Sequence, residues 1–205
     1  MKITLKWLEE KCACEEGVAW FKSQKKTESI DVLKALIDDK KYDYANWLVV
    51  RVMTRPQYLA YAIFAAEQVI DIFERKYPDD KIPRKAIEAA KAVLKDDTPE
   101  TRYAAYAASD AASAAAAYAA YAASAASAAA AYAASAASAA AAYAASAAYA
   151  ASAASDAYAA AYAASAASAS SDAAAESKMK TKILKYGLGL LESANKGDEN
   201  EISID

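Results

Sequence analysis

The tract from Tyr103 to Ala175 constrains the fold of this chain most strongly. It consists almost entirely of Ala, Ser and Tyr, contains no Gly, Pro, Lys or Arg, and carries charge only at Asp110, Asp156 and Asp172. Alanine has the highest intrinsic helix propensity of all residues, and nothing in the tract opposes it strongly. The tract is therefore predicted to form long helices, although low-complexity sequence is more often disordered.

An 11-residue repeat orders the middle of this tract. Residues 121–131 read YAASAASAAAA, residues 132–142 repeat these letters, and a third copy starts at Tyr143. Eleven residues complete three turns at about 3.67 residues per turn, so the repeated tyrosines share one helix face. The opposite face is alanine alone, which lets another backbone approach closely. The candidate partner-binding residues on the tyrosine face are Tyr118, Tyr121, Tyr132, Tyr143, Ser124 and Ser135.

The sequence divides into four parts. We expect an N-terminal helical domain at 1–97, the Ala/Tyr/Ser-rich tract at 98–175, an amphipathic helix at 176–195 and an acidic tail at 196–205. The amphipathic helix has one apolar stripe, formed by Ile183, Leu184, Leu188 and Leu191, which needs a packing partner. A single rod would hold that stripe far from the N-terminal domain, so the long helices are predicted to fold back as a helical hairpin. The expected break points are the Ser-Asp pairs at 109–110, 155–156 and 171–172.

The first hundred residues predict an all-α bundle of about five short helices. Apolar residues recur at helical spacing, and each group follows a capping residue or a proline. One helix is expected from Thr4 through Cys12, with an interruption at Gly17, and one is expected to run unbroken from Pro56 to Phe73. The expected caps or first-turn residues are Thr4, Ser29, Asp43, Pro56, Pro83 and, at the start of the long helices, Thr98.

Composition excludes several kinds of function. The net charge is −3 and no segment has the basic excess that nucleic-acid binding requires. The chain has no histidine, and Cys12 and Cys14 are expected to point apart on a helix, so we expect no Ser–His or Cys–His pair, no zinc site and no disulfide. There is no signal-peptide pattern and no long apolar span. A cytoplasmic protein without enzymatic activity, cofactor, bound nucleic acid or membrane attachment is expected.

Four segments resemble a known family. Residues 5–9, 14–21, 45–48 and 77–91 are similar to small bacterial and phage-encoded immunity proteins with an Imm-5-like domain, which also continue into Ala-rich helices. The most specific part is the block from Pro83 to Ala90, PRKAIEAA. The chain departs from the family pattern at Ile82, where arginine is expected, and in lacking histidine. The resemblance implies binding and neutralisation of a partner toxin, and it carries over no catalytic residue.

Three functional interpretations remain open. The tyrosine stripe favours a protein-binding module, either an immunity protein or a phage accessory factor, because tyrosine gives a large contact area at little entropic cost. Alternatively, the Ala-rich repeat with regular hydroxyls resembles helical antifreeze proteins, although those present threonine rather than tyrosine. In the third interpretation, large tyrosines interlock with small alanines as core, and the tract binds nothing.

Overall fold

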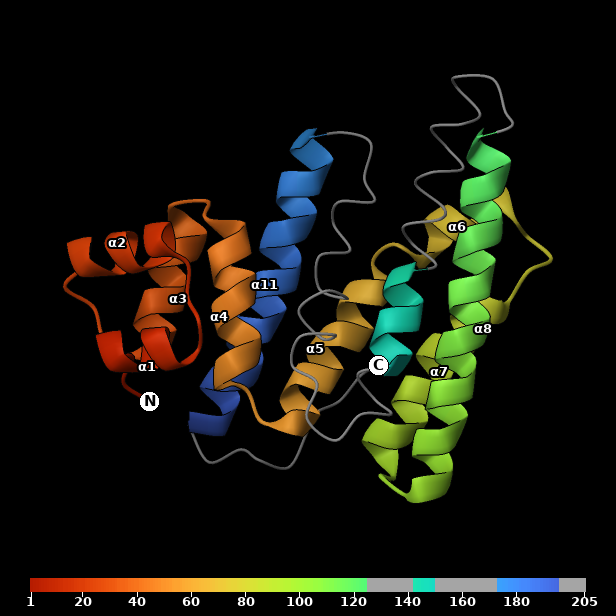
Figure 1. Cartoon of the computed structure of the whole chain (residues 1–205), viewed down its shortest axis with the longest axis horizontal. Helices are drawn as coiled ribbons and strands as arrows, with labels where there is room; N and C mark the ends of the chain where they lie inside the picture. Colours follow the sequence, from red (N-terminus) through yellow and green to blue (C-terminus); the bar gives the residue numbers. More distant parts are fainter. Residues whose placement is uncertain (125–141, 150–172, 196–205) are drawn as a thin grey trace.

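The computed structural model describes residues 1–124, 142–149 and 173–195, and the described part is all-α as the sequence predicts (Figure 1). The side chains of residues 118–124 and 173–175 are also outside this description. Within the described ranges, β-structure is limited to one isolated bridge between Lys2 and Glu28. A short helical segment, 142–149, accompanies the following helices: α1 (Leu5–Glu10), α2 (Glu15–Ser23), α3 (Ser29–Asp38), α4 (Tyr42–Val52), α5 (Arg55–Glu67), α6 (Ile70–Lys76), α7 (Ile82–Lys95), α8 (Pro99–Ser124) and α11 (Ala173–Asn195).

Several predicted helix starts are confirmed. The Thr4 hydroxyl accepts a hydrogen bond from the Trp7 backbone N–H at 3.1 Å and caps α1. Pro56 and Pro83 occupy the first turns of α5 and α7, where the missing backbone N–H has no helical acceptor in any case. The Thr98 hydroxyl accepts from the Thr101 backbone N–H at 3.2 Å, where α8 begins.

Other predicted boundaries are wrong. The helix that starts after Thr4 ends at Glu10 rather than continuing through Cys12, and Gly17 lies inside α2. Ser29 and Asp43 lie inside the first turns of α3 and α4 and do not cap them; the N-cap residues are Glu28 and Lys41.

The helix expected from Pro56 to Phe73 is broken in two. α5 ends at Glu67, and α6 begins at Ile70. Val69 and Ile70 are both buried at this break. The apolar spacing along residues 56–73 predicted one continuous helix and did not reveal this break.

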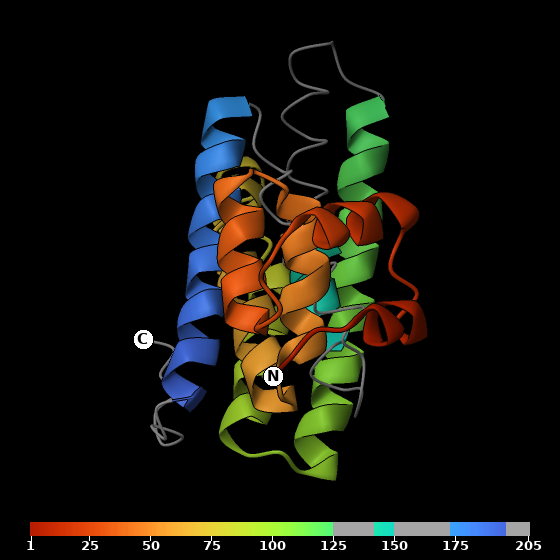
Figure 2. The ribbon, with the colours of Figure 1, turned by 90° about the vertical axis from the view of Figure 1, so that its left-hand side faces the viewer.

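The C-terminal helix completes the core of the N-terminal helices. Ile183, Leu184 and Leu191 of α11 are buried, which confirms that its apolar stripe is packed. α11 lies against α3, α4 and α5 (Figures 1 and 2). Tyr186 stacks on Phe64 of α5 with ring centroids 4.0 Å apart. Residues 176–195 and helices of the segment 1–97 therefore share one core.

Part of the Ala-rich tract also packs closely. The segment 142–149 lies against α7 and α8 through a cluster formed by Ala86, Ala112, Ala145 and Ala148. The buried Ser109 hydroxyl donates a hydrogen bond to the Ala145 carbonyl at 2.9 Å. α8 runs through the pair 109–110 without the expected break. The predicted hairpin depends on residues 125–141, which lie outside the described residues, as do the pairs 155–156 and 171–172 and the tail 196–205.

Among the residues that the structure describes, no helix combines the length and the apolar character needed to cross a bilayer.

Candidate functional site

The predicted tyrosine site is only partly within the described structure. Tyr118, Tyr121 and Ser124 belong to α8, but their side chains lie outside the described residues, and Tyr132 and Ser135 lie outside them altogether.

Tyr143 differs from the expectation for a partner-binding residue. Its side chain is 7% exposed and belongs to the main hydrophobic core. The repeat places tyrosines on one face of a helix but does not say which way that face turns. For Tyr143 the face turns inward, so its ring is not available to a partner.

Other tyrosines of the same tract are exposed. Tyr103 and Tyr106 of α8 are 76% and 47% exposed, and Tyr149 is 42% exposed. The rings of Tyr106 and Tyr149 form a tilted pair with centroids 6.5 Å apart. These three side chains account for half of the large hydrophobic residues that are exposed in the described structure. They mark the start of α8 and the end of segment 142–149 as an aromatic surface.

A row of exposed alanines continues this surface along α8. We call Tyr103, Tyr106 and the exposed residues Ala104, Ala107, Ala111 and Ala114 the outer face of α8; Asp110 and Ser113 are exposed on the same side. The alanines are spaced three, four and three residues apart, which is the spacing of a helix seam that contacts another helix. In the sequence, Tyr118 and Tyr121 continue this spacing.

The other side of α8 is used for internal packing. Its buried residues in the described part of the helix are Ala105, Ser109, Ala112, Ala115 and Ala116. α8 therefore uses one side for packing, and its outer face is exposed. Tyr103 and Tyr106 precede the 11-residue repeat, so the repeat did not predict them as site residues. The pattern that could have indicated this face is the three-four spacing of alanines from Ala104 onward.

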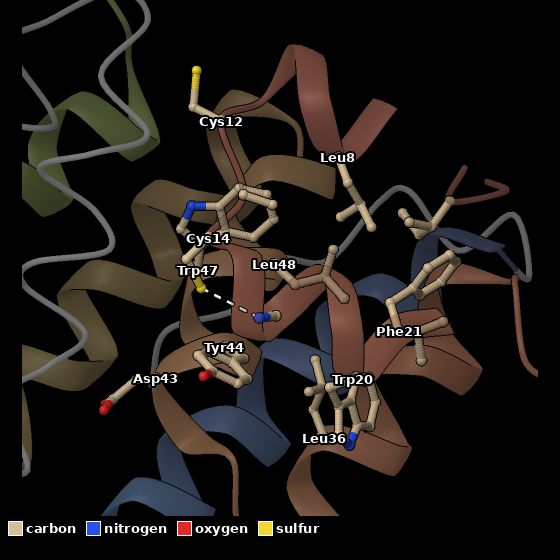
Figure 3. Close-up of a pocket in the computed structure, with 14 residues that line it drawn as sticks. Leu8, Cys12, Cys14, Trp20, Phe21, Leu36, Asp43, Tyr44, Trp47 and Leu48 are labelled. Atoms are coloured by element: carbon tan, nitrogen blue, oxygen red, sulfur yellow. Dashed lines mark hydrogen bonds between the residues drawn. The ribbon is translucent and has the colours of Figure 1, made fainter. Parts of the chain in front are cut away.

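A second candidate site is a pocket in the N-terminal helices (Figure 3). It is a half-open cavity of about 300 Å³ that is lined by residues of α1 to α4, of the α1–α2 connection and of the segment before α1. Buried aliphatic side chains from distant positions, such as Leu8, Leu36 and Leu48, form part of its lining. The aromatic lining residues are Trp20, Phe21, Tyr44 and Trp47. No pattern in the sequence predicted this pocket.

Neighbouring groups fix the two indole rings of the pocket. The Trp20 indole N–H donates a hydrogen bond to the Asp39 carboxylate at 2.8 Å. The Arg51 guanidinium lies above the Trp47 ring, 4.2 Å from its centroid. The rings of Trp7 and Trp47 form a T-shaped pair with centroids 6.0 Å apart and an interplanar angle of 82°. Arg51 also donates to the Trp47 backbone carbonyl at 2.8 Å, so the cation is anchored at two points.

The two cysteines lie at the edge of the pocket rather than on a helix. Cys14 is the N-cap residue of α2, and its thiol accepts a hydrogen bond from the Gly17 backbone N–H at 3.4 Å. Cys12 has a left-handed backbone with φ of 55°, and its thiol points away from the pocket in Figure 3. Both thiols are free, as expected, although the predicted helical placement is wrong.

Hydrogen bonds explain the backbone conformation of Cys12. The Cys12 N–H donates to the Glu9 carbonyl and the Ala13 N–H donates to the Leu8 carbonyl, both at 2.9 Å. These two hydrogen bonds end α1 with Cys12 in the left-handed region, and glycine is the most common residue at such a position. The termination separates α1 from α2 and so opens the space that the pocket occupies.

The electrostatics of the pocket are simple. Burial raises the pKa of the Tyr44 phenol, and nearby Cys14 and Glu16 raise it further, so this hydroxyl is neutral at ordinary pH. Among the described residues that line the pocket, Asp43 is the one that carries a charge. Across the described ranges, no group of three or more acidic or cysteine side chains is placed to hold a metal ion.

Comparisons with models of protein families, with curated proteins and with solved structures found no match to this chain.

Proposed function

We propose that this protein is a cytoplasmic, non-enzymatic protein-binding module and that the outer face of α8 receives a helix of a partner protein. The observation that carries this proposal is the exposed three-four row of alanines beside Tyr103 and Tyr106. Methyl groups along a helix seam allow a second helix to come close, and the tyrosines supply large anchors with a hydroxyl each.

Tyr103 and Tyr106 are expected to supply most of the binding energy at this face. Interface energy concentrates in a few residues, and tyrosine is among the types most often found there. Tyr103 gains most from a partner because it is 76% exposed in the free protein. Alanine contributes little area, so the row of alanines sets the distance and the tyrosines supply most of the affinity. The resemblance to immunity proteins agrees with a binding role of this kind.

Site-specific cross-linking tests the proposal. Tyr103 is replaced by the photo-reactive analogue p-benzoylphenylalanine, which has a similar shape, in the full chain expressed in its source cells. We expect illumination to yield a covalent adduct with one partner protein, and mass spectrometry then identifies that partner. Ile82, exposed on α7, carries the same analogue as a matched control and is expected to give no adduct.

The control decides between interpretations. An adduct from both positions, or from neither, would contradict the proposed face. A covalent dimer of this chain would show that the face binds a second copy instead of another protein.

A purely structural role for the tract is the second candidate, because the burial of Tyr143 shows one tyrosine serving as core. In that case Tyr103 yields no adduct, and replacing Tyr103 changes only stability. The ice-binding interpretation is tested separately, by measuring thermal hysteresis of the purified protein.

A further inference from the structure

We propose that the half-open pocket between α1 and α4 binds a small, uncharged aromatic molecule of fused-ring size. This site is separate from the outer face of α8 and does not depend on the function proposed above. The volume of the pocket, the side chains that form its walls and the charges at its edge together define this ligand class.

The volume sets the size of the ligand. The cavity measures about 300 Å³. An apolar protein cavity of ~150 Å³ is large enough to bind benzene. The pocket is about twice that size, and it falls at the small end of the range for ligand sites in proteins, ~300–1,000 Å³. A two-ring molecule fits this volume, and a large cofactor does not.

The walls favour a flat, aromatic ligand. Trp20 and Tyr44 face the cavity together with Phe21 and Trp47, and aromatic rings in edge or offset contact attract one another beyond the effect of the area they bury. The Asp39 hydrogen bond holds Trp20 in place. The Arg51 guanidinium and the Trp7 ring hold Trp47 in place. The walls of the pocket are therefore already in position before a ligand arrives.

The charges disfavour an anionic ligand. None of the described residues that line the pocket is Lys or Arg, so a buried carboxylate on the ligand would find no cation among them. Asp43 adds a negative charge at the edge, and Glu16 adds to the field at Tyr44. The Lys41 ammonium lies 5.6 Å from the centroid of the Tyr44 ring but does not line the cavity.

A positively charged ligand would gain little binding energy in this pocket. The Asp43 carboxylate points away from the aromatic rings in Figure 3, so an ammonium group among those rings would not reach it. The polar groups next to the rings are the Tyr44 hydroxyl and the Cys14 thiol, and both suit a neutral donor or acceptor. The preferred ligand is therefore neutral, with at most one hydrogen-bonding group.

Three naphthalene probes test the class of ligand. The full-length protein is titrated by calorimetry with 2-naphthol, with 2-(aminomethyl)naphthalene and with 2-naphthoate. We expect 2-naphthol to bind with one site, the amine to bind no more tightly, and naphthoate to bind at least tenfold more weakly. Absence of binding by 2-naphthol would overturn the proposal, and so would naphthoate binding within tenfold of 2-naphthol or the amine binding more tightly than 2-naphthol.

Two matched variants test the location. Ala13 lines the pocket, whereas Ala19 is exposed on α2 and does not. Ala13→Phe fills the cavity and is expected to weaken 2-naphthol binding at least tenfold, while Ala19→Phe leaves it unchanged. Equal effects of the two substitutions would overturn the proposed location.

Thiol protection gives a second readout that does not need the filled variant to fold. In the Cys12→Ser protein, saturating 2-naphthol is expected to slow alkylation of Cys14 by iodoacetamide several-fold. In the Cys14→Ser protein, alkylation of Cys12 is expected to be unaffected, because that thiol points away from the pocket. Equal protection of the two thiols, or no protection of Cys14, would overturn the assignment.

Discussion

Two glycines of α11 should respond in opposite directions to the same substitution. Glycine within a helix costs about 0.5–1 kcal/mol relative to alanine, so Gly→Ala normally stabilises a helix. At Gly189 an added methyl group would meet no atom within 4 Å. Gly189→Ala is therefore expected to raise the free energy of unfolding by about 0.5–1 kcal/mol.

At Gly187 the methyl group has no room. It would lie 2.8 Å from Tyr61 Cε2 and 3.2 Å from Val49 Cγ2. Both neighbours are fully buried, and the Tyr61 hydroxyl is tied to the Asn46 side chain at 3.1 Å. Overpacking of this kind costs about 1–3 kcal/mol, which exceeds the gain in helix propensity. Gly187→Ala is therefore expected to destabilise the protein by about 1–2 kcal/mol.

Urea unfolding followed by circular dichroism at 222 nm measures both effects. For a chain of this size, 1 kcal/mol corresponds to a melting-temperature change of about 2–4 °C, so thermal scans provide an independent check. Equal stabilisation by Gly187→Ala and Gly189→Ala would show that α11 does not approach Tyr61 this closely.

Three further perturbations concern single contacts. Lys40 ends α3 with a left-handed φ of 55°, so Lys40→Gly is expected to stabilise by about 1 kcal/mol in urea unfolding. Ser109→Ala removes a buried hydrogen bond to Ala145 and is expected to destabilise by about 0.5–1.5 kcal/mol in the same assay. Hydrogen bonds from Arg84 at 2.6 and 2.7 Å lower the pKa of Glu74 below its ordinary value of 4.5. The stability from ionised Glu74 is therefore present above pH 4.5 and is lost as the pH falls through the lowered pKa, so melting scans should show wild type and Glu74→Gln converging in acid.

Each of these three substitutions has a matched control. Lys40→Ala keeps the unfavourable backbone and should not stabilise, so equal effects of Gly and Ala would contradict the explanation. Ser113 is exposed on the same helix as Ser109, and Ser113→Ala should change stability little. If the difference between wild type and Glu74→Gln is the same at pH 7 and pH 3, the ion pair with Arg84 does not contribute as argued.

Local signals in the sequence predicted the class of fold and several helix starts. Pro83 and Thr98 act within one helical turn, so they could be recognised without knowing the fold. The end of α1 could not be recognised in this way, because Cys12 occupies a position where glycine is the usual signal. The packing of Ile183 and Leu184 was predicted from their common stripe, although the identity of their partners was not.

The candidate sites were harder to predict. Periodicity grouped the tyrosines but could not show that Tyr143 faces inward while Tyr103 faces outward. The pocket combines side chains as far apart in the chain as Ile3 and Leu48, and no local pattern reports such a combination. The resemblance to immunity proteins stays a prediction.

The position of α11 has a consequence for synthesis on the ribosome. The Gln57 side chain donates a hydrogen bond to the Leu190 carbonyl, and 133 residues separate the two. At ~5–20 residues per second, translation of that interval takes roughly 7–27 s. Throughout that time Val49 and Tyr61 lack the helix that covers them. The nascent chain therefore carries an incomplete apolar core while the entire Ala-rich tract is being made, and a chain truncated before α11 would expose that core permanently.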